Sequence, residues 1–471
     1  MKSLVSFEFD SLFLQTNRAR ALYALEQIGY FLRFPFSIRM NKDEAEGCKF
    51  TFCYGPCESS RRGPTLYIPF EESWYKSDAS PKFLIREGIP VPYFLTLPKD
   101  FIAKTADGNL ALSFDLVGAV YWFLSRQEEN GSEKFESPLL EKYGFLHKPV
   151  IDVWVKKIKK LILGICAGES PYPVWGDKEF AVCLTHDVDD IRPLRRPWGK
   201  DPFPKFEHWM NEETQYGFKS TFFFLPQEMS RLSSFDRPYL YSEKIDFRGY
   251  LVKCGEIIRT MDREGFEVGL HGSYFSYLEK DELESQKKQI EITIGKSVVS
   301  VRQHYLHFLA PKTWSAQNAA GFLYDSTLGF SRRVGFRSGS SYPFNAFDCS
   351  KNTALGILEI PLNIQDVGLL GGVVPARRFP FYLFGGIPPK GKYKLDRALS
   401  IFEACVSEVK NMGGVAVLLW HPDKIWHNKY PYWFAVYKEL LSYLFKQNAF
   451  VSSLKEVGEK WVKMQEKIFI K

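Results

Sequence analysis

The chain has 471 residues, of which 45% are apolar and 25% charged, as in an ordinary folded protein rather than a disordered or fibrous one. It carries 62 Lys and Arg against 55 Asp and Glu, and a net charge of +7 is too thinly spread for a dedicated nucleic-acid-binding protein. Aromatic residues make up 16% of the chain, which fits either a large core or a surface that stacks on sugar-like partners.

The N-terminal sequence predicts no secretory signal, because Glu8 and Asp10 interrupt its only apolar stretch and no small-residue cleavage site follows. The longest candidate membrane run, at 161–168, is far short of the roughly 20 residues that a membrane span needs. The eight cysteines include no CxxC pair, so we expect buried thiols rather than a zinc ribbon or a disulfide framework. These features predict a cytoplasmic protein with no transmembrane segment.

Residues 1–175 are predicted to form an accessory α/β domain. Its patterns are a helix running into a strand at 18–38, strands at 65–70 and 90–97, and helices at 114–129 and 150–165. The domain boundary is placed near 171–180, where Pro, Gly and charged residues precede a strongly apolar strand. No constellation of catalytic side chains occurs in this part, and its sequence does not indicate its role.

Residues 176–471 have a different sequence pattern, in which short apolar runs alternate with helical segments. The runs lie at 180–187, 219–226, 266–272, 298–305, 356–362 and 414–421, with helices predicted at 281–295 and 395–414. Runs that are apolar throughout are typical of strands buried on both faces of a parallel sheet. The alternation therefore favours an α/β barrel or a doubly wound sheet.

Several of these runs end in polar side chains of a kind that enzymes use. In a parallel α/β barrel the carboxyl ends of the strands meet at one rim, where catalytic groups are placed. We therefore expect two carboxylates, two or three imidazoles and one guanidinium to meet there. The residues at these ends are Asp187, Asp189, His271, Arg302, His304 and His421.

The types and spacing of these residues suggest metal-assisted hydrolysis. In an extended segment Asp187 and Asp189 face the same side, so one carboxylate can bind a metal while the other takes a proton from water. A bound divalent ion lowers the pKa of that water to about 7. His421 suits a general acid that protonates a leaving nitrogen, and Arg302 would orient the base by charge pairing.

Five segments resemble motifs of the polysaccharide deacetylase family (carbohydrate esterase family four): VCLTHDVDD, GFKSTFFFL, EVGLHGSYFSY, VRQHY and VLLWHP. The resemblance spans roughly 180–460, and SFDLVGAVYWFLSRQEE with KYGFLHKPVIDVWV resembles an accessory domain found in one bacterial branch. It implies a distorted (β/α)7-type barrel preceded by a smaller α/β domain, and removal of sugar acetyl groups with a divalent metal, usually zinc. On this resemblance the base is Asp187, a ligand carboxylate is Asp189, the first ligand imidazole is His271, the third motif holds Arg302 and Tyr305, and the acid is His421.

The chain departs from the family pattern at two motif positions. Val188 stands where the family has its second Asp, and Phe275, which cannot bind a metal, stands where a second ligand His belongs. Since catalytic zinc has three protein ligands, we predict that His304 completes the set with Asp189 and His271. His307 is the weaker candidate, since its position is more typical of a surface or loop residue.

Other polar residues lie in predicted loops near the rim. Asp325, Arg337 and Asp366 are typical of structural ion pairs or turns, with substrate contact as the alternative, which we predict for Arg337. Basic clusters at 192–200 and 332–337 are typical of solvated faces, and beside a rim they would also suit an anionic glycan or lipid-linked saccharide.

The leading hypothesis from the sequence is a sugar N-deacetylase, a hydrolase of non-peptide C–N bonds with zinc as its metal and an acetylated saccharide or glycoconjugate as its substrate. Tyr274, Phe275, Tyr305 and Trp420 are predicted to form a wall that stacks on the sugar. Two alternatives stay open: a catalytically inactive deacetylase-like glycan-binding protein, which Phe275 favours, and a hydrolase of another non-peptide C–N bond. The sequence does not indicate the oligomeric state.

Overall fold

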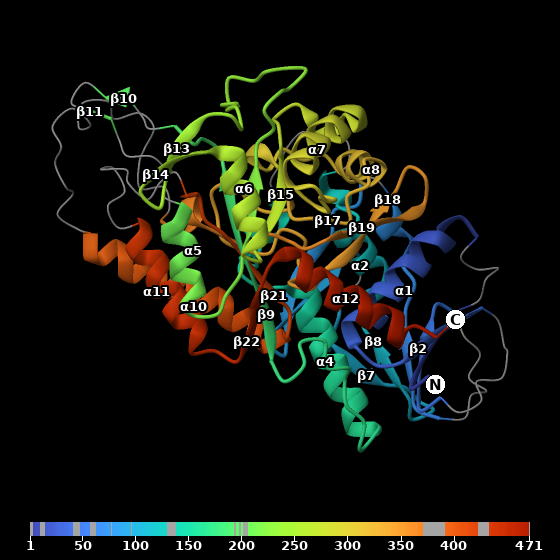
Figure 1. Cartoon of the computed structure of the whole chain (residues 1–471). Coiled ribbons are helices and arrows are strands. Elements are labelled where there is room, and N and C mark those ends of the chain that lie inside the picture. Colours follow the sequence, from blue (N-terminus) through green and yellow to red (C-terminus); the bar gives the residue numbers. More distant parts are fainter. Residues whose placement is uncertain are drawn as a thin grey trace.

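The structure is a computed structural model that describes residues 3–9, 15–40, 48–56, 63–76, 78–95, 97–129, 138–192, 195–196, 199–200, 206–370, 391–422 and 433–470. Two main sheets organise these residues, and helices pack against both (Figure 1). This arrangement confirms the predicted α/β class. Among the described helices, none is long and apolar enough to cross a membrane.

The first sheet belongs to the N-terminal part of the chain. Its strands run in the order β2-β1-β3-β4-β8-β7 and are parallel except that β7 is antiparallel to β8. The elements of this part are β1 (Val5–Phe9), α1 (Arg18–Leu32), β2 (Phe36–Met40), β3 (Phe50–Tyr54), β4 (Thr65–Ile68), the hairpin of β5 (Lys82–Arg86) and β6 (Ile89–Tyr93), β7 (Ile102–Lys104), β8 (Leu110–Leu112), α2 (Leu116–Leu124), α3 (Pro138–Lys142) and α4 (Val150–Ile165).

The second sheet belongs to the C-terminal part and curls into a half-barrel (Figure 1). Its order is β18-β19-β17-β16-β15-β12-β9-β21-β20, with β22 also on β9, and only β18 is antiparallel to its neighbour. The strands are β9 (Phe180–Val188), β12 (Thr221–Phe224), β15 (Glu267–Gly272), β16 (Ser300–Gln303), β17 (Tyr324–Asp325), β18 (Phe344–Asp348), β19 (Thr353–Glu359), β20 (Ile364–Gln365), β21 (Val415–Leu419) and β22 (Ala449–Ser452). Each of the six predicted apolar runs overlaps one of these strands.

Helices and two hairpins connect these strands. They are β10–β11 (Arg195–Arg196, Gly199–Lys200), α5 (Phe206–Thr214), β13–β14 (Lys244–Phe247, Tyr250–Lys253), α6 (Cys254–Arg263), α7 (Lys280–Ile294), α8 (Lys312–Ala319), α9 (Asp366–Leu369), α10 (Gly391–Met412), α11 (Trp433–Phe445) and α12 (Leu454–Ile468). The end of the chain returns to the N-terminal part, where the Ile470 N–H donates to the Phe36 carbonyl at 2.8 Å. In Figure 1 the red helix α12 accordingly lies beside the blue helix α1.

Helix α2 helps to explain how the two parts pack. All nine of its residues are buried, and a helix that is apolar on every side is a core element. Asp115 caps its first turn by accepting a hydrogen bond from the Gly118 N–H at 2.7 Å. α2 contacts α1 on one side and β18 on another, while α1 contacts β19, so the parts share an apolar layer. The boundary near residue 175 stays a prediction.

A buried ion-pair cluster adds polar contacts across this layer. Glu129 accepts from Arg126 at 2.5 Å and from two nitrogens of Arg337 at 3.0 Å each. Nearby, Asp152 of α4 accepts from the hydroxyls of Ser340 and Ser341 at 2.6 Å each. The prediction that Arg337 contacts substrate is therefore corrected: its side chain is only 1% exposed and its guanidinium is committed to Glu129 across the two parts.

We expect Glu129→Ala to lower the free energy of unfolding by about 3–5 kcal/mol, because it leaves two buried guanidinium groups without their carboxylate. Burial alone would raise the pKa of Glu129, but Arg126 and Arg337 outweigh it and lower the pKa from 4.5 to about 2. The stabilisation should therefore be present above pH 4.5 and be lost as the pH falls toward 2. Urea unfolding at several pH values measures both effects. Glu87→Ala, which breaks the exposed pair with Lys157, should cost at most about 1 kcal/mol.

The cysteines differ in one respect from the sequence expectation. Cys53 is disulfide-bonded, whereas the sequence predicted buried thiols. The other described cysteines are free, and four of these six are buried. A disulfide depends on how closely the folded backbone brings two Cα atoms together, which spacing in the sequence does not reveal.

Candidate metal centre

The predicted site residues lie at the carboxyl ends of strands in the second sheet. Asp187 is near the end of β9 and Asp189 follows that strand directly, while His421 follows β21, which pairs with β9. His271 of β15 and Arg302 of β16 are opposite each other in the register of those two strands. Because these strands are parallel, their carboxyl ends share one edge of the sheet, as the sequence predicted.

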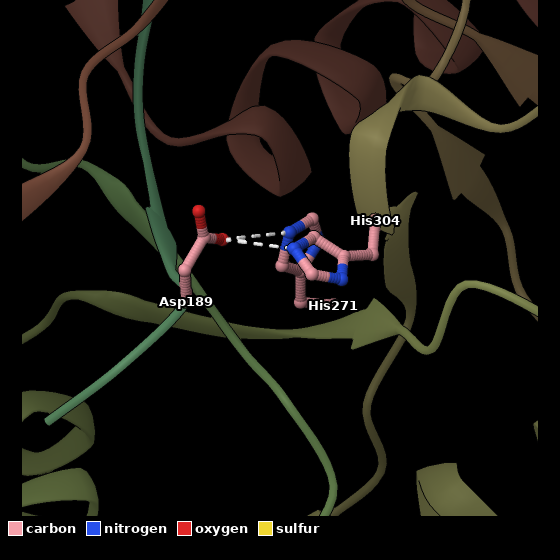
Figure 2. A group of neighbouring side chains, drawn as sticks. All are labelled: Asp189, His271 and His304. Carbon is pink, nitrogen blue, oxygen red and sulfur yellow. Dashed lines mark ion pairs between the residues drawn. The ribbon is translucent and has the colours of Figure 1, made fainter. Parts of the chain in front are cut away.

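Three of these residues bring potential metal-ligand atoms close together. Among the residues that the structure describes, no other group of three or more His, Cys, Asp or Glu side chains does so. Asp189 Oδ1 lies 3.3 Å from His271 Nε2 and 3.6 Å from His304 Nε2. All three ligand atoms are within 4.8 Å of one another. Figure 2 shows both imidazole rings turned toward the same carboxylate oxygen. Four ligands at about 2.0–2.1 Å around a tetrahedral zinc lie about 3.3 Å apart, so the spacing fits one small divalent ion.

The hydrogen bonds of the two imidazoles direct both Nε2 atoms toward Asp189. His271 Nδ1 donates to the Arg302 carbonyl at 2.9 Å, and His304 Nδ1 donates to Asp236 at 2.7 Å. In a neutral imidazole with Nδ1 protonated, the lone pair is on Nε2, so both lone pairs face the Asp189 carboxylate. Asp189 Oδ1 is buried and has no hydrogen-bond partner among the described residues. A divalent cation satisfies all three acceptors at once.

The electrostatics of the group favour positive charge in the same place. Burial would raise the pKa of Asp189, but the facing imidazoles of His421, His271 and His304 hold it well below its usual range. Burial would lower the pKa of His271, and the Asp187 and Asp189 carboxylates outweigh it and raise that pKa. The carboxylates therefore stabilise positive charge on this side of the rim, whether it is carried by protons or by a metal.

His304 is held by a carboxylate that the sequence did not reveal. Asp236 has a fully buried side chain, and in addition to His304 it accepts from the backbone N–H of Tyr274 at 3.0 Å and of Ser233 at 3.3 Å. A carboxylate behind a ligand imidazole fixes the ring orientation and makes the metal-binding nitrogen more basic. The His304 ring is thus oriented by Asp236, with its Nε2 directed toward Asp189.

We expect Asp236→Ala to weaken metal binding by about 10- to 100-fold, because His304 loses the partner that sets its tautomer and direction. Asp236→Asn keeps an acceptor oxygen for His304 Nδ1 and should retain more affinity than the alanine variant. Competition titrations with a metal chelator of known affinity measure both. Asp281→Ala, at a side chain that is 96% exposed, is the matched control and should change nothing. Unchanged affinity in Asp236→Ala would show that His304 is held in place without this carboxylate.

Asp187 lies beside the metal group and is held by Arg302. The Arg302 guanidinium donates to Asp187 Oδ1 at 2.9 Å, to the Thr185 hydroxyl at 2.7 Å, and to the carbonyl and hydroxyl of Ser326. Asp187 Oδ2 lies 3.7 Å from His271 Nε2. The guanidinium is fully buried, so it fixes Asp187 with its second oxygen directed toward the ligand group.

His421 contacts the group from its Asp189 end. Its Nε2 lies 3.7 Å from Asp189 Oδ2, and its Nδ1 contacts Asp366 at 2.9 Å. Asp366 also accepts from the His421 backbone N–H and from Trp433 Nε1, at 2.8 and 3.0 Å. This buried carboxylate fixes the orientation of the His421 imidazole, so that Nε2 is directed toward Asp189.

Three of the four predicted wall residues, Tyr274, Phe275 and Tyr305, are at least partly exposed. Tyr305 is 56% exposed and its ring lies 4.8 Å from the His304 ring, while the half-buried Tyr274 ring lies 6.2 Å from that of Tyr305. Trp420 is fully buried against Trp433 and Tyr437, so the prediction that it stacks on a sugar is corrected. Side chains alternate along a strand, and the neighbour of a rim residue therefore points into the core.

Sequence reasoning missed the supporting groups rather than the central ones. The sequence indicates Asp366 only as a polar loop residue. It does not indicate Asp236 as a site residue, because Asp236 lies in a loop far from the other site residues in sequence. Their proximity to two histidines is the property that identifies them, and it exists only in the folded chain.

Comparisons with known proteins give one family match and several similar solved structures. Residues 11–166 match a family of unknown function, DUF7033. No curated protein matches the chain. Among solved structures, a protein from Mycobacterium smegmatis, provisionally assigned as a polysaccharide deacetylase, is 20% identical with a TM-score of 0.42, covering 64% of this chain and 95% of its own.

Two further similar structures come from Bacillus. Peptidoglycan deacetylase PdaC of Bacillus subtilis is 14% identical, with a TM-score of 0.30 and coverage of 62% of this chain and 96% of its own. A pseudoenzyme of carbohydrate esterase family four from Bacillus anthracis is 11% identical, with a TM-score of 0.32 and coverage of 60% and 66%.

Proposed function

We propose that the protein is a metal-dependent hydrolase that removes acetyl groups from N-acetylated sugars. The observation that carries the proposal is one constellation: a three-residue ligand group, Asp189, His271 and His304, contacted by Asp187 on one side and by His421 on another. Each of these two flanking residues has its own buried partner, Arg302 and Asp366. Amide hydrolysis needs a base that takes a proton from the attacking water and an acid that protonates the leaving nitrogen.

The residues of the chain take distinct roles in the reaction. A divalent cation held by the ligand group would supply Lewis acidity and lower the pKa of a water molecule at the site. Asp187 accepts the proton of the attacking water, and Arg302 keeps its carboxylate in position. His421 gives its Nε2 proton to the departing sugar nitrogen, while Asp366 holds the imidazole through Nδ1. The products are acetate and the free amino sugar.

Zinc is the proposed metal. Two imidazole nitrogens and one carboxylate oxygen are borderline donors that suit zinc, and three protein ligands are the number that catalytic zinc sites use. The motif resemblance of residues 180–460 supports the choice of an acetylated sugar as substrate. Two exposed aromatic rings beside the site, those of Phe235 and Tyr305, suit the apolar faces of a sugar.

The test is acetate release from a panel of N-acetylated sugars by purified protein. The panel should include cyclic amides and ureides, which probe the alternative of another C–N bond. We expect acetate release that a chelator abolishes and that added zinc restores. Full activity of the chelated protein without added metal would exclude the metal-dependent mechanism.

A catalytically inactive glycan-binding protein is the second candidate, because Phe275 occupies the position of a family ligand and lies beneath the Arg231 guanidinium at 3.8 Å. Metal analysis discriminates between the two. Bound metal that is lost in His304→Ala favours the enzyme, whereas saccharide binding by a wild-type protein that takes up no metal favours the binding protein.

A further inference from the structure

Two cationic side chains are enclosed where the two parts of the chain meet. Lys159 of α4 is only 8% exposed, and Arg33, which directly follows α1, is partly buried. Helix α4 contacts both α1 and α10, so it belongs to the layer that the two parts share. Lys and Arg side chains are rarely buried unless an acidic group pairs with them, so two such cations in one place need an explanation.

Neither cationic group makes a hydrogen bond or an ion pair with any residue that the structure describes. The Arg33 Nε atom is buried without an acceptor. The Arg33 guanidinium lies against Gly413, where an added Cβ atom would be 2.9 Å from Nη2. The next lysine on α4, Lys157, forms an ion pair with Glu87 at 2.7 Å instead. The group that Arg33 and Lys159 lack is therefore an anion.

The Tyr342 ring brings the two cations to one region. Lys159 Nζ lies 6.0 Å from the centroid of this ring, and the Tyr342 hydroxyl donates to the Met412 carbonyl. Gly413, which contacts Arg33, follows Met412 in the chain. Both cations therefore lie beside Tyr342, with Arg33 and Lys159 supplied by the N-terminal part and the other three residues by the C-terminal part.

The carboxylate whose charge acts on Lys159 is Asp152, and it has other partners. Asp152 accepts from the hydroxyls of Ser340 and Ser341 at 2.6 Å each and from the Ser341 N–H at 2.8 Å. Burial raises the pKa of Asp152 to about 7, so it is only partly ionised near neutral pH and does not balance two cations. Lys156, three residues before Lys159 on the same face of α4, adds further positive charge.

The two cations are of the kinds that bind phosphate in proteins. A guanidinium binds phosphate oxygens through two parallel hydrogen bonds, and an ammonium acts on them as a point charge. Burial and the neighbouring Arg33 lower the pKa of Lys159, and a bound anion would counteract both effects by stabilising the ammonium. A phosphate dianion carries the charge that one guanidinium and one ammonium balance.

We propose that Arg33 and Lys159 form a binding site for a phosphate group where the N-terminal and C-terminal parts meet. Gly413 precedes β21, so the site lies at the amino ends of the strands, on the opposite edge of the sheet from the metal centre. The ligand is inorganic phosphate or the phosphate monoester of a small molecule. Because the ligand contacts both parts, its binding stabilises their packing. The site does not depend on the proposed deacetylation.

The experiment is a calorimetric titration of inorganic phosphate, and separately of glycerol 3-phosphate, into the full chain at an ionic strength held constant with sodium chloride. We expect saturable binding that Arg33→Gln and Lys159→Met each weaken by about 10- to 100-fold, because each removes charge-assisted hydrogen bonds. Lys160→Met is the matched control, since this lysine lies on the same helix but is exposed, and it should bind as wild type does. Without phosphate, Lys159→Met should melt no lower than wild type, because it removes a buried charge that lacks a counterion.

Binding of inorganic phosphate alone identifies the free ion as the ligand, binding of glycerol 3-phosphate identifies a phosphate monoester, and either result supports the site. A wild-type protein that responds to phosphate no more than to chloride overturns it. Binding that persists in Arg33→Gln and Lys159→Met also overturns it, as does binding that disappears in His304→Ala, because phosphate then occupies another place or the metal centre. A lower melting temperature of phosphate-free Lys159→Met would show that the ammonium already has a stabilising partner, which likewise overturns the site.

Discussion

His304→Ala should lower the affinity for zinc by more than about 100-fold, because it removes one of only three protein ligands, and even the partners of ligands are worth 10- to 100-fold. The remaining pair, Asp189 and His271, lies 3.3 Å apart but cannot complete a catalytic site. Metal content after dialysis, followed by competition with a chelator, measures the loss. Acetate release should disappear in parallel at limiting zinc.

The matched control for this substitution is His147→Ala, which removes an exposed imidazole from the N-terminal part. It should bind zinc as wild type does. His304→Ala with stoichiometric, tightly bound zinc would contradict the ligand group proposed here. Circular dichroism of each variant shows whether a loss of metal reflects unfolding instead.

Asp187→Asn should reduce kcat by about 10²- to 10⁴-fold while zinc stays bound, since general-base catalysis contributes about this much. The amide cannot take up the proton, yet it can still accept a hydrogen bond from Arg302. The ligand atoms of Asp189, His271 and His304 are untouched by this change. Single-turnover acetate release, measured together with metal content on the same sample, separates the two effects.

Asp177→Asn serves as the control for Asp187→Asn, because the Asp177 carboxylate is 85% exposed and lies ahead of β9. Its kcat should equal that of wild type. An Asp187→Asn protein that keeps full activity would exclude this carboxylate as the base. Loss of zinc in that variant would instead make Asp187 a fourth ligand.

Much of the fold was predictable because local patterns have local causes. Each of the six apolar runs overlaps a strand of the second sheet, and α4 begins and ends where the helical spacing at 150–165 does. A continuous apolar run has to be buried on both faces, and an amphipathic one on a single face. The residues after these strands could then be grouped, because parallel strands bring their carboxyl ends to one edge.

Errors arose where neighbouring chain segments decide a side chain's surroundings. Arg337 was predicted to contact substrate, but Glu129, more than 200 residues earlier in sequence, pairs with it. Trp420 precedes the rim residue His421 and points into the core instead. Cys53 was expected as a thiol and is disulfide-bonded. The surroundings of these three residues cannot be inferred from the spacing of residues in the sequence, because they depend on where other segments of the chain pack.

The sequence by itself determined the α/β class and the strand ends at which chemistry-bearing residues are placed, since hydrophobic patterning and parallel strand geometry fix both. It also named Asp189, His271 and His304 as a ligand set. Only the tertiary structure decided that the three nitrogen and oxygen atoms face one another, and that Asp236, Arg302 and Asp366 hold the groups around them. The reason is physical: residue types follow from local sequence, but the direction of a lone pair is set by hydrogen-bond partners that folding brings from elsewhere in the chain.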